Sequence, residues 1–333
     1  MNLDLFKFEK LPEAPKIHPV PVGAHCPLFS VMIPVCNRTK YLRQALESVF
    51  NENYPIEEMQ ICIVDNSTET IFWENFLSSE ERKRVEIFKQ PVHVSLGDNW
   101  NACIQQSRGH LVHILHDDDW ILPGFYEEIQ KLNNDNPLSA LLATRSFTTD
   151  SDGVLQGISQ RIVSHETVSA EFNIFVEMNP LFCPSIVFKR DFCEQNGGFI
   201  SYFRHCIDWE MWLRATVKSG LTISQQPLCC YRYSSDADTH KAVKYATNLQ
   251  DYLKIYLFSK ETIADFPFNQ SINYLIARAI SQESEMKARG DLEAAALARK
   301  FVDTLCPPKP STKIKWLLHG IGNMFKNLAK RTS

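Results

Sequence analysis

The chain has 333 residues, 44% of them hydrophobic and 22% charged, a composition typical of a globular protein with one large domain or two fused units. Its net charge of −4 excludes a surface built as a whole to bind nucleic acid, because no global positive field is available to gather phosphates. Ten cysteines are scattered without a C-x-x-C pair, which predicts reduced thiols rather than a disulfide framework or a zinc site.

The first 27 residues contain five prolines and little periodicity, so we expect an extended lead-in along the surface of the fold. This segment lacks the basic region and the long apolar core of a secretion signal. No stretch of the chain reaches the ~18 apolar residues that a membrane span needs. We therefore expect a cytoplasmic protein.

Strand-like and helix-like segments alternate between residues 28 and 122. Apolar, β-branched runs predict strands at 28–35, 59–67, 85–88 and 110–119, and helical spacing predicts helices at about 37–54 and 98–109. This alternation predicts an α/β fold with a doubly wound parallel sheet and right-handed crossovers. Ligands of such sheets bind at the carboxyl ends of the strands, so Asp65 and the acids at 117–119 are expected on one rim.

The pattern is mixed in the following hundred residues. Strands are expected at 139–150, 183–190 and 220–234, and helices at 169–178 and 208–220. This aromatic half is expected to bind a substrate and to share the sheet. Helix formers then predict a helical C-terminal region, which the prolines at 306–310 end.

Three consecutive carboxylates, Asp117, Asp118 and Asp119, lie between two apolar runs. A solvated acidic turn is one explanation. A bound cation is the other, because three anions within a few ångströms repel one another and apolar neighbours are a poor setting for free solvation. Hard oxygen ligands select Mg²⁺ or Mn²⁺, and an ion held by one or two carboxylates keeps coordination places open for a diphosphate.

The common nucleotide-binding motifs are absent. No G-x-x-x-x-G-K-[ST] segment is present, and no G-x-G-x-x-G segment follows the first strand, which argues against a P-loop enzyme and a dinucleotide oxidoreductase. The first predicted strand ends instead in IPVCNRTKYL, and the second ends in an acid able to accept hydrogen bonds from a base or ribose. These features are typical of a mononucleotide site.

Four segments resemble the ordered motifs of glycosyltransferase family 2. They read FSVMIPVCNRTKYLRQALESVF, ICIVDNS, SLGDNWNACIQQSRGHLVHILHDDDWILPG, and GGF followed by DWEMWLR, within residues 28–235. The resemblance implies the GT-A fold, which is Rossmann-like with a mostly parallel central sheet. It further implies inverting transfer of a sugar from a nucleotide diphosphate sugar to a hydroxyl of a glycan or lipid-linked acceptor. A UDP-sugar is favoured over dTDP-rhamnose and GDP-sugars on family grounds alone.

The resemblance also implies roles for residues of the donor site. The loop that wraps the base in the family matches Pro34, Val35, Asn37 and Arg38. Asp65 matches the acid that contacts the uracil or ribose. The segment that closes over the nucleotide matches Asp98 and Asn99.

The three acids at 117–119 match the family's DxD-type motif, which contacts the ribose and the metal. Counting back from Pro123 places Mn²⁺ or Mg²⁺ on Asp118, with Asp119 as a second ligand. The family often shows D-x-D-D, and here His116 takes the first aspartate position. The ribose contact therefore stays open between Asp117 and Asp119.

The catalytic base of the family precedes a W-x-x-W-L-R-like helix. In CIDWEMWLR this position is Asp208, and Ile207 replaces the glutamate that often precedes it. An N-cap of the following helix is the structural alternative for Asp208, and both roles can hold together. Glu210 is the fallback base. His240, beyond the YR pair at 231–232, is a further candidate metal ligand.

Residues 311–333 form a candidate basic amphipathic helix. Apolar residues recur at helical spacing from Ile314 to Leu328, with Lys and Arg around them and no acid in the segment. Such a helix is typical of a membrane-surface anchor, and a helix docked on the protein's own core is the alternative. The anchor would place the enzyme peripherally at the inner face of the cytoplasmic membrane, in surface polysaccharide or cell envelope biosynthesis.

The expected domain organisation follows from these segments. It comprises a lead-in at 1–27, a GT-A domain at 28–238 with a nucleotide-binding half at 28–122 and an acceptor-binding half at 123–238, a helical region at 239–305, and the basic helix at 311–333.

Two other functions compete with glycosyl transfer. A sugar nucleotidyltransferase would carry a phosphate loop rich in glycine and basic residues after the first strand, and residues 34–42 are not such a loop. A catalytically decayed nucleotide-sugar or carbohydrate-binding protein would not need the acids at Asp118 and Asp208.

Overall fold

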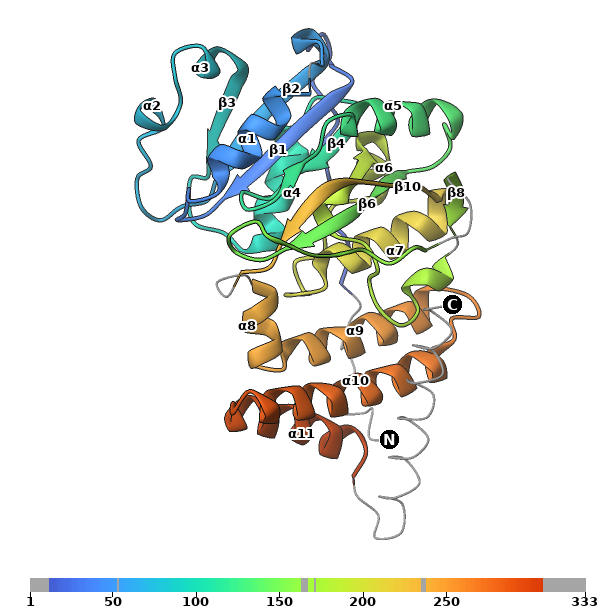
Figure 1. Cartoon of the computed structure of the whole chain (residues 1–333). Coiled ribbons are helices and arrows are strands. Elements are labelled where there is room, and N and C mark those ends of the chain that lie inside the picture. Colours follow the sequence, from blue (N-terminus) through green and yellow to red (C-terminus); the bar gives the residue numbers. More distant parts are fainter. Residues whose placement is uncertain (1–11, 53, 163–166, 171, 235–237, 308–333) are drawn as a thin grey trace.

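The computed structural model describes residues 12–52, 54–162, 167–170, 172–234 and 238–307. Figure 1 shows two layers of architecture: an α/β part built on one sheet, and a stack of helices from the C-terminal region beneath it. The predicted basic helix at 311–333 lies outside the described residues.

One sheet contains all the strands described. Its strands are β1 (Phe29–Val35), β2 (Met59–Asp65), β3 (Val85–Lys89), β4 (Leu111–Ile114), β5 (Trp120–Ile121), β6 (Leu141–Thr149), β7 (Leu155–Ile158), β8 (Thr167–Ala170), β9 (Ile186–Lys189) and β10 (Leu221–Arg232). The order is β3-β2-β1-β4-β9-β6-β10-β5, while β7 pairs with β6 and β8 with β10. The strands from β3 to β4 are parallel, as predicted for the first half. Beyond β4 the sheet is mixed, because β9 runs antiparallel to both β4 and β6.

Eleven α-helices are described, on both faces of the sheet and below it. They are α1 (Leu42–Phe50), α2 (Trp73–Phe76), α3 (Glu81–Arg84), α4 (Leu96–Gln106), α5 (Phe125–Asp135), α6 (Arg190–Asn196), α7 (Ile207–Ser219), α8 (Asp238–Lys244), α9 (Thr247–Thr262), α10 (Phe268–Ala288) and α11 (Leu292–Leu305). Short 3₁₀ segments are η2 (Ile56–Glu58), η3 (Phe172–Phe175) and η4 (Cys183–Ser185).

The central strand β1 is buried on both faces, which explains why all of its residues except Ser30 are apolar. Val31 and Ile33 face a core completed by α1 and α5. Met32, between them, faces the opposite core, which contains residues of α4 and α7. Successive strand residues point to opposite faces, so a strand covered on both sides is apolar at nearly every position, and the buried Ser30 hydroxyl donates to Gln60 Oε1 at 2.6 Å.

The C-terminal helices share the second core with the sheet. Leu249 and Tyr256 of α9, Leu275 of α10 and Phe301 of α11 belong to the same buried cluster as Trp212 of α7. Figure 1 shows α9, α10 and α11 stacked one below another under α7. The helical region is therefore an integral support of the α/β part rather than a tethered appendage.

Two sequence predictions of secondary structure need correction. The helix expected at 169–178 is wrong, because residues 167–170 form β8 along β10 and residues 172–175 form η3. The helix expected from about residue 37 begins only at Leu42. Asn37 has a φ of 56°, a left-handed conformation that a helix cannot include, and the loop that follows is part of the candidate site.

Residues 12–27 contain no helix or strand. Ile17 is buried in the second core, and the Pro15 carbonyl accepts a hydrogen bond from the Gly198 amide at 2.8 Å. Within the described ranges, no helix combines the length and the apolar character needed to span a membrane.

Candidate active site

The site lies where the sheet changes its direction of winding. The chain moves outward from β1 to β2 and β3, then returns to place β4 on the other side of β1. The loops after β1 and β4 consequently diverge at the carboxyl ends of neighbouring parallel strands. Between these loops, β10 and the helices α7 to α9 lies a cavity of about 900 Å³.

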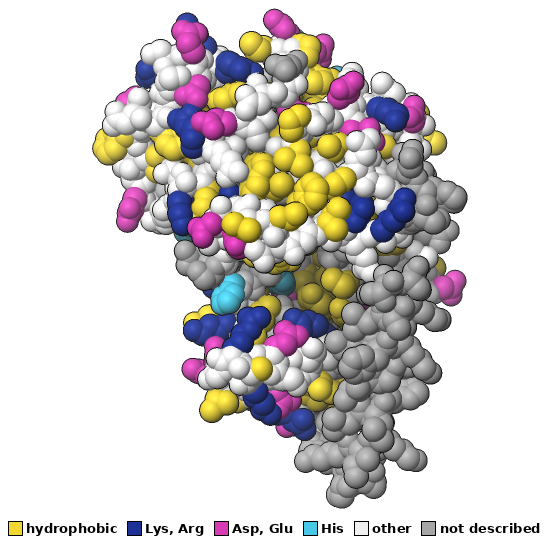
Figure 2. All heavy atoms as spheres, viewed as in Figure 1, with side chains coloured by type: hydrophobic (Ala, Val, Ile, Leu, Met, Phe, Trp, Pro, Cys, Tyr) yellow, Lys and Arg dark blue, Asp and Glu magenta, His cyan; other side chains and the backbone are white. Residues whose placement is uncertain are grey.

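Most of the predicted site residues line this cavity. They are Pro34, Val35, Asn37, Arg38, Asn99, Asp117, Asp118 and Asp208. Figure 2 shows the molecule hollowed between the α/β part and the C-terminal helices, with basic side chains and histidines gathered along the helix side of the hollow. Thr239 of α8 and Tyr252 of α9 complete the wall there.

The loop after β1 is fastened to the loop after β2. The Asn37 amide donates to Ser67 Oγ at 2.8 Å, and Asn37 Oδ1 accepts from the Thr68 amide at 2.9 Å. Asparagine tolerates the left-handed conformation better than most residues, which accounts for its use at this turn. The turn directs the next side chain, Arg38, into the cavity.

Arg38 binds two of the three consecutive acids. Its Nε and Nη2 donate to Asp117 Oδ2 and Oδ1 at 2.8 and 2.7 Å, and Nη2 also donates to Asp118 Oδ2 at 2.6 Å. Asp117 and Asp118 are only 6% and 7% exposed, so their charges have little water to stabilise them. The guanidinium supplies the compensating charge.

The third acid has different partners. Asp119 Oδ1 accepts from the Arg232 amide at 2.8 Å, and His116 Nδ1 lies 3.2 Å from Asp119 Oδ2. The imidazole of His116 stacks on the Trp100 ring, with centroids 5.3 Å apart. Arg38 thus compensates the first two carboxylates, and the Arg232 amide and His116 contact the third, so groups of the protein supply part of the compensation that the sequence argument assigned to a bound cation.

Arg232 fixes the backbone of the acidic loop. Its guanidinium lies 4.1 Å from the Tyr41 ring centroid and 4.7 Å from that of Trp120. Nε donates to the Asp118 carbonyl at 2.9 Å, and Nη2 donates to Gln44 Oε1 at 2.6 Å. The hydrogen-bond acceptors of this guanidinium are neutral, and it packs over two aromatic rings. Arg232 therefore contributes positive charge next to the acidic loop without forming an ion pair with any of the carboxylates.

A group suited to a divalent cation lies at the floor of the cavity. One ligand atom from each of His116, Asp118 and Asp119 falls within 4.8 Å of the others. Among the described residues, His116 Nε2 and Asp119 Oδ2 are buried and make no hydrogen bond, and the nearest charged partner of Asp119 Oδ2 is His116 Nδ1 at 3.2 Å. One imidazole and two carboxylates with unused ligand atoms fit Mn²⁺ or Mg²⁺, so the residues present are compatible with the ion.

Burial and mutual charge shift the pKa values of these groups. Burial raises the pKa of Asp117, and the hydrogen bonds and charge of Arg38 oppose that rise. Burial also raises the pKa of Asp119, against the influence of His116. For His116, burial lowers the pKa, but the Cys183 sulfur and the Asp119 carboxylate raise it well above its ordinary value. A proton held at this pair would leave when a cation binds.

Asp208 lies in the first turn of α7 and lines the same cavity. Its Oδ2 accepts from Asn179 Nδ2 at 2.9 Å, and its Oδ1 accepts from the Trp209 amide at 2.8 Å. Burial raises its pKa to about 6, partly offset by these hydrogen bonds and by His116. Cys206 occupies the N-cap position without a side-chain capping hydrogen bond, and Asp208 is the second residue of the helix, so the structural alternative that Asp208 is the N-cap is wrong.

Glu210, the alternative candidate base, and the glycine turn at Gly198 have structural roles. Glu210 is buried and accepts from Arg214 Nε at 2.7 Å, and it does not line the cavity. The same guanidinium donates to the Gly198 carbonyl at 2.7 Å. A Cβ added at Gly198 would lie 2.1 Å from Asn101 Oδ1, so the turn before α7 needs glycine for close packing against α4.

Several other predicted residues lie outside the cavity lining. Asp65 is 1% exposed and accepts from the Ser67 amide and Trp73 Nε1, so it stabilises the loop behind the site. Asp98 accepts from Ser95 Oγ at the start of α4 and from Ser201 Oγ. His240 is exposed on α8 and does not belong to the group formed by His116, Asp118 and Asp119.

Sequence patterns did not single out the aromatic wall of the cavity. Phe182 stacks on Tyr231 with centroids 4.6 Å apart, and Tyr233 meets the Tyr231 ring edge-on at 5.1 Å. Tyr231 and Tyr233 flank Arg232 at the end of β10, so the YRY segment was the available signal. For His116, its place directly before the acids was the signal.

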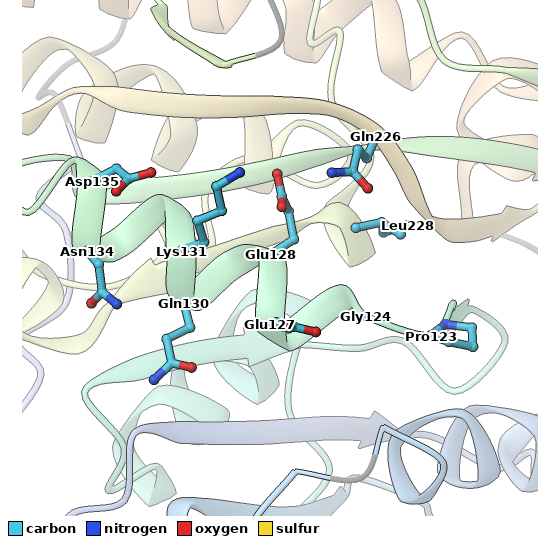
Figure 3. Close-up of a pocket in the computed structure, with 10 residues that line it drawn as sticks. All are labelled: Pro123, Gly124, Glu127, Glu128, Gln130, Lys131, Asn134, Asp135, Gln226 and Leu228. Carbon is cyan, nitrogen blue, oxygen red and sulfur yellow. The ribbon is translucent and has the colours of Figure 1, made fainter.

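A second hollow of about 550 Å³ lies away from these groups. Figure 3 shows its lining side chains, which come from α5 and from β10 near Gln226. Its charged members are Glu127, Glu128, Lys131 and Asp135. None of the predicted site residues lines it, so the candidate active site is the cavity at the switch point.

Comparison with known proteins identifies the family. The model of the family described as "Glycosyl transferase family 2" matches residues 30–195, about half of the chain, including the loop after β1 and all three acids. The chain belongs to glycosyltransferase family 2. It is therefore a glycosyltransferase, as the sequence motifs predicted.

One curated relative and two solved structures illustrate the similarity. The uncharacterized glycosyltransferase YwdF of Bacillus subtilis is 22% identical over 78% of this chain and 92% of its own length. S. aureus TarS in complex with UDP-GlcNAc superposes with a TM-score of 0.59 at 16% identity, covering 89% of this chain and 80% of that one. The mannosyltransferase PcManGT of Pyrobaculum calidifontis, in complex with GDP-Man and Mn²⁺, gives 0.51 at 16% identity, with 96% and 91% covered. The predicted GT-A fold is thereby confirmed.

The role of Arg232 in this glycosyltransferase can be tested by stability. Arg232→Met leaves the Asp118 carbonyl and Gln44 Oε1 without their donor and removes charge beneath three buried acids. We expect the free energy of unfolding to fall by about 2–4 kcal/mol, measured by urea denaturation. Arg82→Met, whose described hydrogen bond is an exposed contact with Ser79, is the matched control and should change it by no more than about 0.5 kcal/mol. Equal effects would contradict the account.

Proposed function

We propose that the chain is a metal-dependent, inverting glycosyltransferase that moves a sugar from a nucleotide diphosphate sugar to a hydroxyl group. One observation carries the proposal: Asp118, from the acidic group able to hold a cation, and Asp208, an acid with a raised pKa, line the same cavity. Glycosyl transfer needs a cation beside the leaving diphosphate and a base beside the attacking hydroxyl, both within reach of one anomeric carbon.

The donor is assigned to the side of the cavity formed by the loops after β1 and β4. Pro34, Val35 and Asn37 would border the base, and Arg38 and Asp117 would lie near the ribose and diphosphate. Asn99 also lines this side, while Asp65 and Asp98 would act from behind it by holding the loops. We infer a UDP-sugar, since TarS was solved with UDP-GlcNAc, although PcManGT was solved with GDP-Man.

The cation is assigned to Asp118 and Asp119, with His116 as the third ligand in place of His240. When bound, Mn²⁺ or Mg²⁺ supplies Lewis-acid stabilisation of the negative charge that develops on the departing diphosphate. Support comes from the clustering of these three side chains, from the buried His116 Nε2 that makes no hydrogen bond to a described residue, and from the Mn²⁺ in the PcManGT complex. Arg232, beneath the acids, holds the loop that carries them.

Asp208 is proposed as the catalytic base. Its carboxylate would accept the proton of the acceptor hydroxyl while the oxygen attacks the anomeric carbon from the face opposite the diphosphate. A single displacement inverts the anomeric configuration. Asn179 and the Trp209 amide orient the carboxylate, and burial raises its pKa to about 6, closer to neutral pH than an ordinary aspartate.

The acceptor is assigned to the half of the GT-A domain at 123–238, and the donor to the half at 28–122. Phe182, Tyr231 and Tyr233 form an aromatic wall on the acceptor side, where the faces of sugar rings could stack. A glycan or a lipid-linked sugar both present such rings. The helical region at 239–305 closes the cavity with Thr239, Lys241 and Tyr252.

We further propose a cytoplasmic enzyme held peripherally at the inner membrane face by residues 311–333, acting in surface polysaccharide or cell envelope biosynthesis. The support is the basic amphipathic pattern of that segment, which suits a surface of anionic lipid. A lipid-linked acceptor would be reached from the same surface.

Replacement of the proposed base should abolish turnover without abolishing donor binding. Asp208→Asn keeps the size of the side chain but cannot accept the proton, so we expect release of nucleoside diphosphate from a nucleotide sugar and acceptor to fall by about 10³-fold. Donor affinity, measured by calorimetry, should change less than threefold. Asp191→Asn, on an exposed acid of α6, is the control and should leave both unchanged. Full turnover in Asp208→Asn would contradict the assignment and favour a binding module.

The rate should depend on the ionisation of Asp208. The base works unprotonated and its pKa lies at about 6, so kcat/KM should fall roughly tenfold per pH unit below pH 6 and level off above it. The residual activity of Asp208→Asn should lack this limb. A profile that is flat down to pH 5 would contradict the base assignment.

Membrane attachment can be tested by liposome flotation. The full chain should float with vesicles that contain anionic lipid, whereas a chain that ends at residue 310 should stay in the dense fraction. Added salt should weaken recovery of the full chain because screening weakens the attraction. Equal recovery of both chains would reject the anchor and favour a helix docked on the protein itself.

A further inference from the structure

We propose that Arg38 is the resident counter-cation of the donor site, and that it exchanges Asp118 for the donor's diphosphate when a divalent ion binds with the nucleotide. The inference rests on the proposed function, because it concerns the same site. It assigns to Arg38 a positioning role that couples the binding of the ion to that of the donor.

The geometry of the contact is asymmetric. Arg38 grips Asp117 with two parallel hydrogen bonds, from Nε at 2.8 Å and from Nη2 at 2.7 Å. A single further bond, from Nη2 to Asp118 Oδ2 at 2.6 Å, reaches the second acid. The paired contact with Asp117 is the stronger anchor, since both donors of one edge of the guanidinium match both carboxylate oxygens.

Only the weaker of these attachments conflicts with a bound ion. The group able to hold a cation contains Asp118 but not Asp117. An ion bound to the Asp118 carboxylate would repel the guanidinium bonded to Asp118 Oδ2 and so weaken that one hydrogen bond of Nη2, while the paired contact with Asp117 could persist. Arg38 would be kept at the rim of the ion site rather than expelled from the cavity.

The guanidinium retains donors for a second anion. Arg38 lines the cavity with 36% of its side chain exposed, and Nη1 makes no hydrogen bond to any residue that the structure describes. The Nη2 hydrogen released from Asp118 would then be free to donate to another ligand of the ion. A diphosphate bound to that ion presents oxygens suited to a planar guanidinium.

Burial makes the compensation necessary in the free enzyme. Asp117 and Asp118 are 6% and 7% exposed, and two such charges without a cation would repel each other strongly. An ion that binds without a nucleotide must displace Arg38 from Asp118, and it supplies no other anion for the guanidinium. An ion that arrives with a diphosphate gives the guanidinium a new anion, so ion and nucleotide should each raise the affinity of the other.

Manganese binding measures this competition directly. The free enzyme, Arg38→Gln and Lys40→Gln are titrated with MnCl₂ alone, with unbound Mn²⁺ followed by electron paramagnetic resonance, and then again with UDP or GDP present. Lys40 is an exposed lysine two residues away that does not line the cavity, so it controls for the loss of one positive charge. Circular dichroism melts establish that each variant is folded.

We expect Arg38→Gln to bind Mn²⁺ alone roughly tenfold more tightly than the unmodified enzyme, the scale of one charge-assisted hydrogen bond. The increase in Mn²⁺ affinity caused by the nucleoside diphosphate should shrink by a similar factor in this variant. Lys40→Gln should behave as the unmodified enzyme within about twofold. If Arg38→Gln does not fold, Arg38→Lys is measured instead. It keeps the charge but loses the two parallel hydrogen bonds to Asp117, so we expect a smaller rise in Mn²⁺ affinity and a smaller loss of the nucleotide effect.

The outcomes separate the inference from the proposed function. Mn²⁺ affinity that is unchanged or weaker in the Arg38 variants, or an undiminished effect of the nucleotide, overturns the inference and leaves the metal site standing. Absence of Mn²⁺ binding in every form, with and without nucleotide, overturns both.

Discussion

Compensation of three adjacent, buried carboxylates is the constraint on which this site depends. Asp117, Asp118 and Asp119 follow one another at the end of a buried strand and are each less than 10% exposed. Arg38 supplies the charge for the first two, and the Arg232 amide and His116 serve the third. Because most of these partners come from the loop after β1 and the end of β10, segments far apart in the sequence must meet for the acids to be tolerated.

The sheet provides that meeting point. The chain places β2 and β3 on one side of β1 and β4 on the other, so the loops after β1 and β4 diverge at this edge of the sheet. Strand β10, from the second half of the chain, brings Arg232 to the same edge. The helices α7 and α9 then cover the cavity from below, in one core with the sheet. The proposed donor and acceptor sides of the cavity thus belong to one packed unit.

The sequence predicted those parts of the fold that depend on local pattern. The mostly apolar strands β1 and β2 were found near their observed bounds, and the helical character of the region that contains α10 and α11 was predicted, since burial on both faces or helix-forming composition sets them. The strand at 167–170 was mistaken for part of a helix, because its pairing with β10 is a long-range contact. Motifs also named the acids, Asp208 and Arg38 as candidates, whereas the pairing of Arg38 with the acids and the contacts of Arg232 required knowledge of which loops meet.

The central claim is that this acidic group holds a divalent ion for the donor's diphosphate. Crystals grown with MnCl₂ and UDP, measured at the manganese absorption edge, test it most directly. The account predicts one strong anomalous peak within coordination distance of Asp118 and Asp119, at about 2.0–2.4 Å, with diphosphate density beside it. Ordered nucleotide in the cavity without such a peak, or a peak elsewhere, would contradict it.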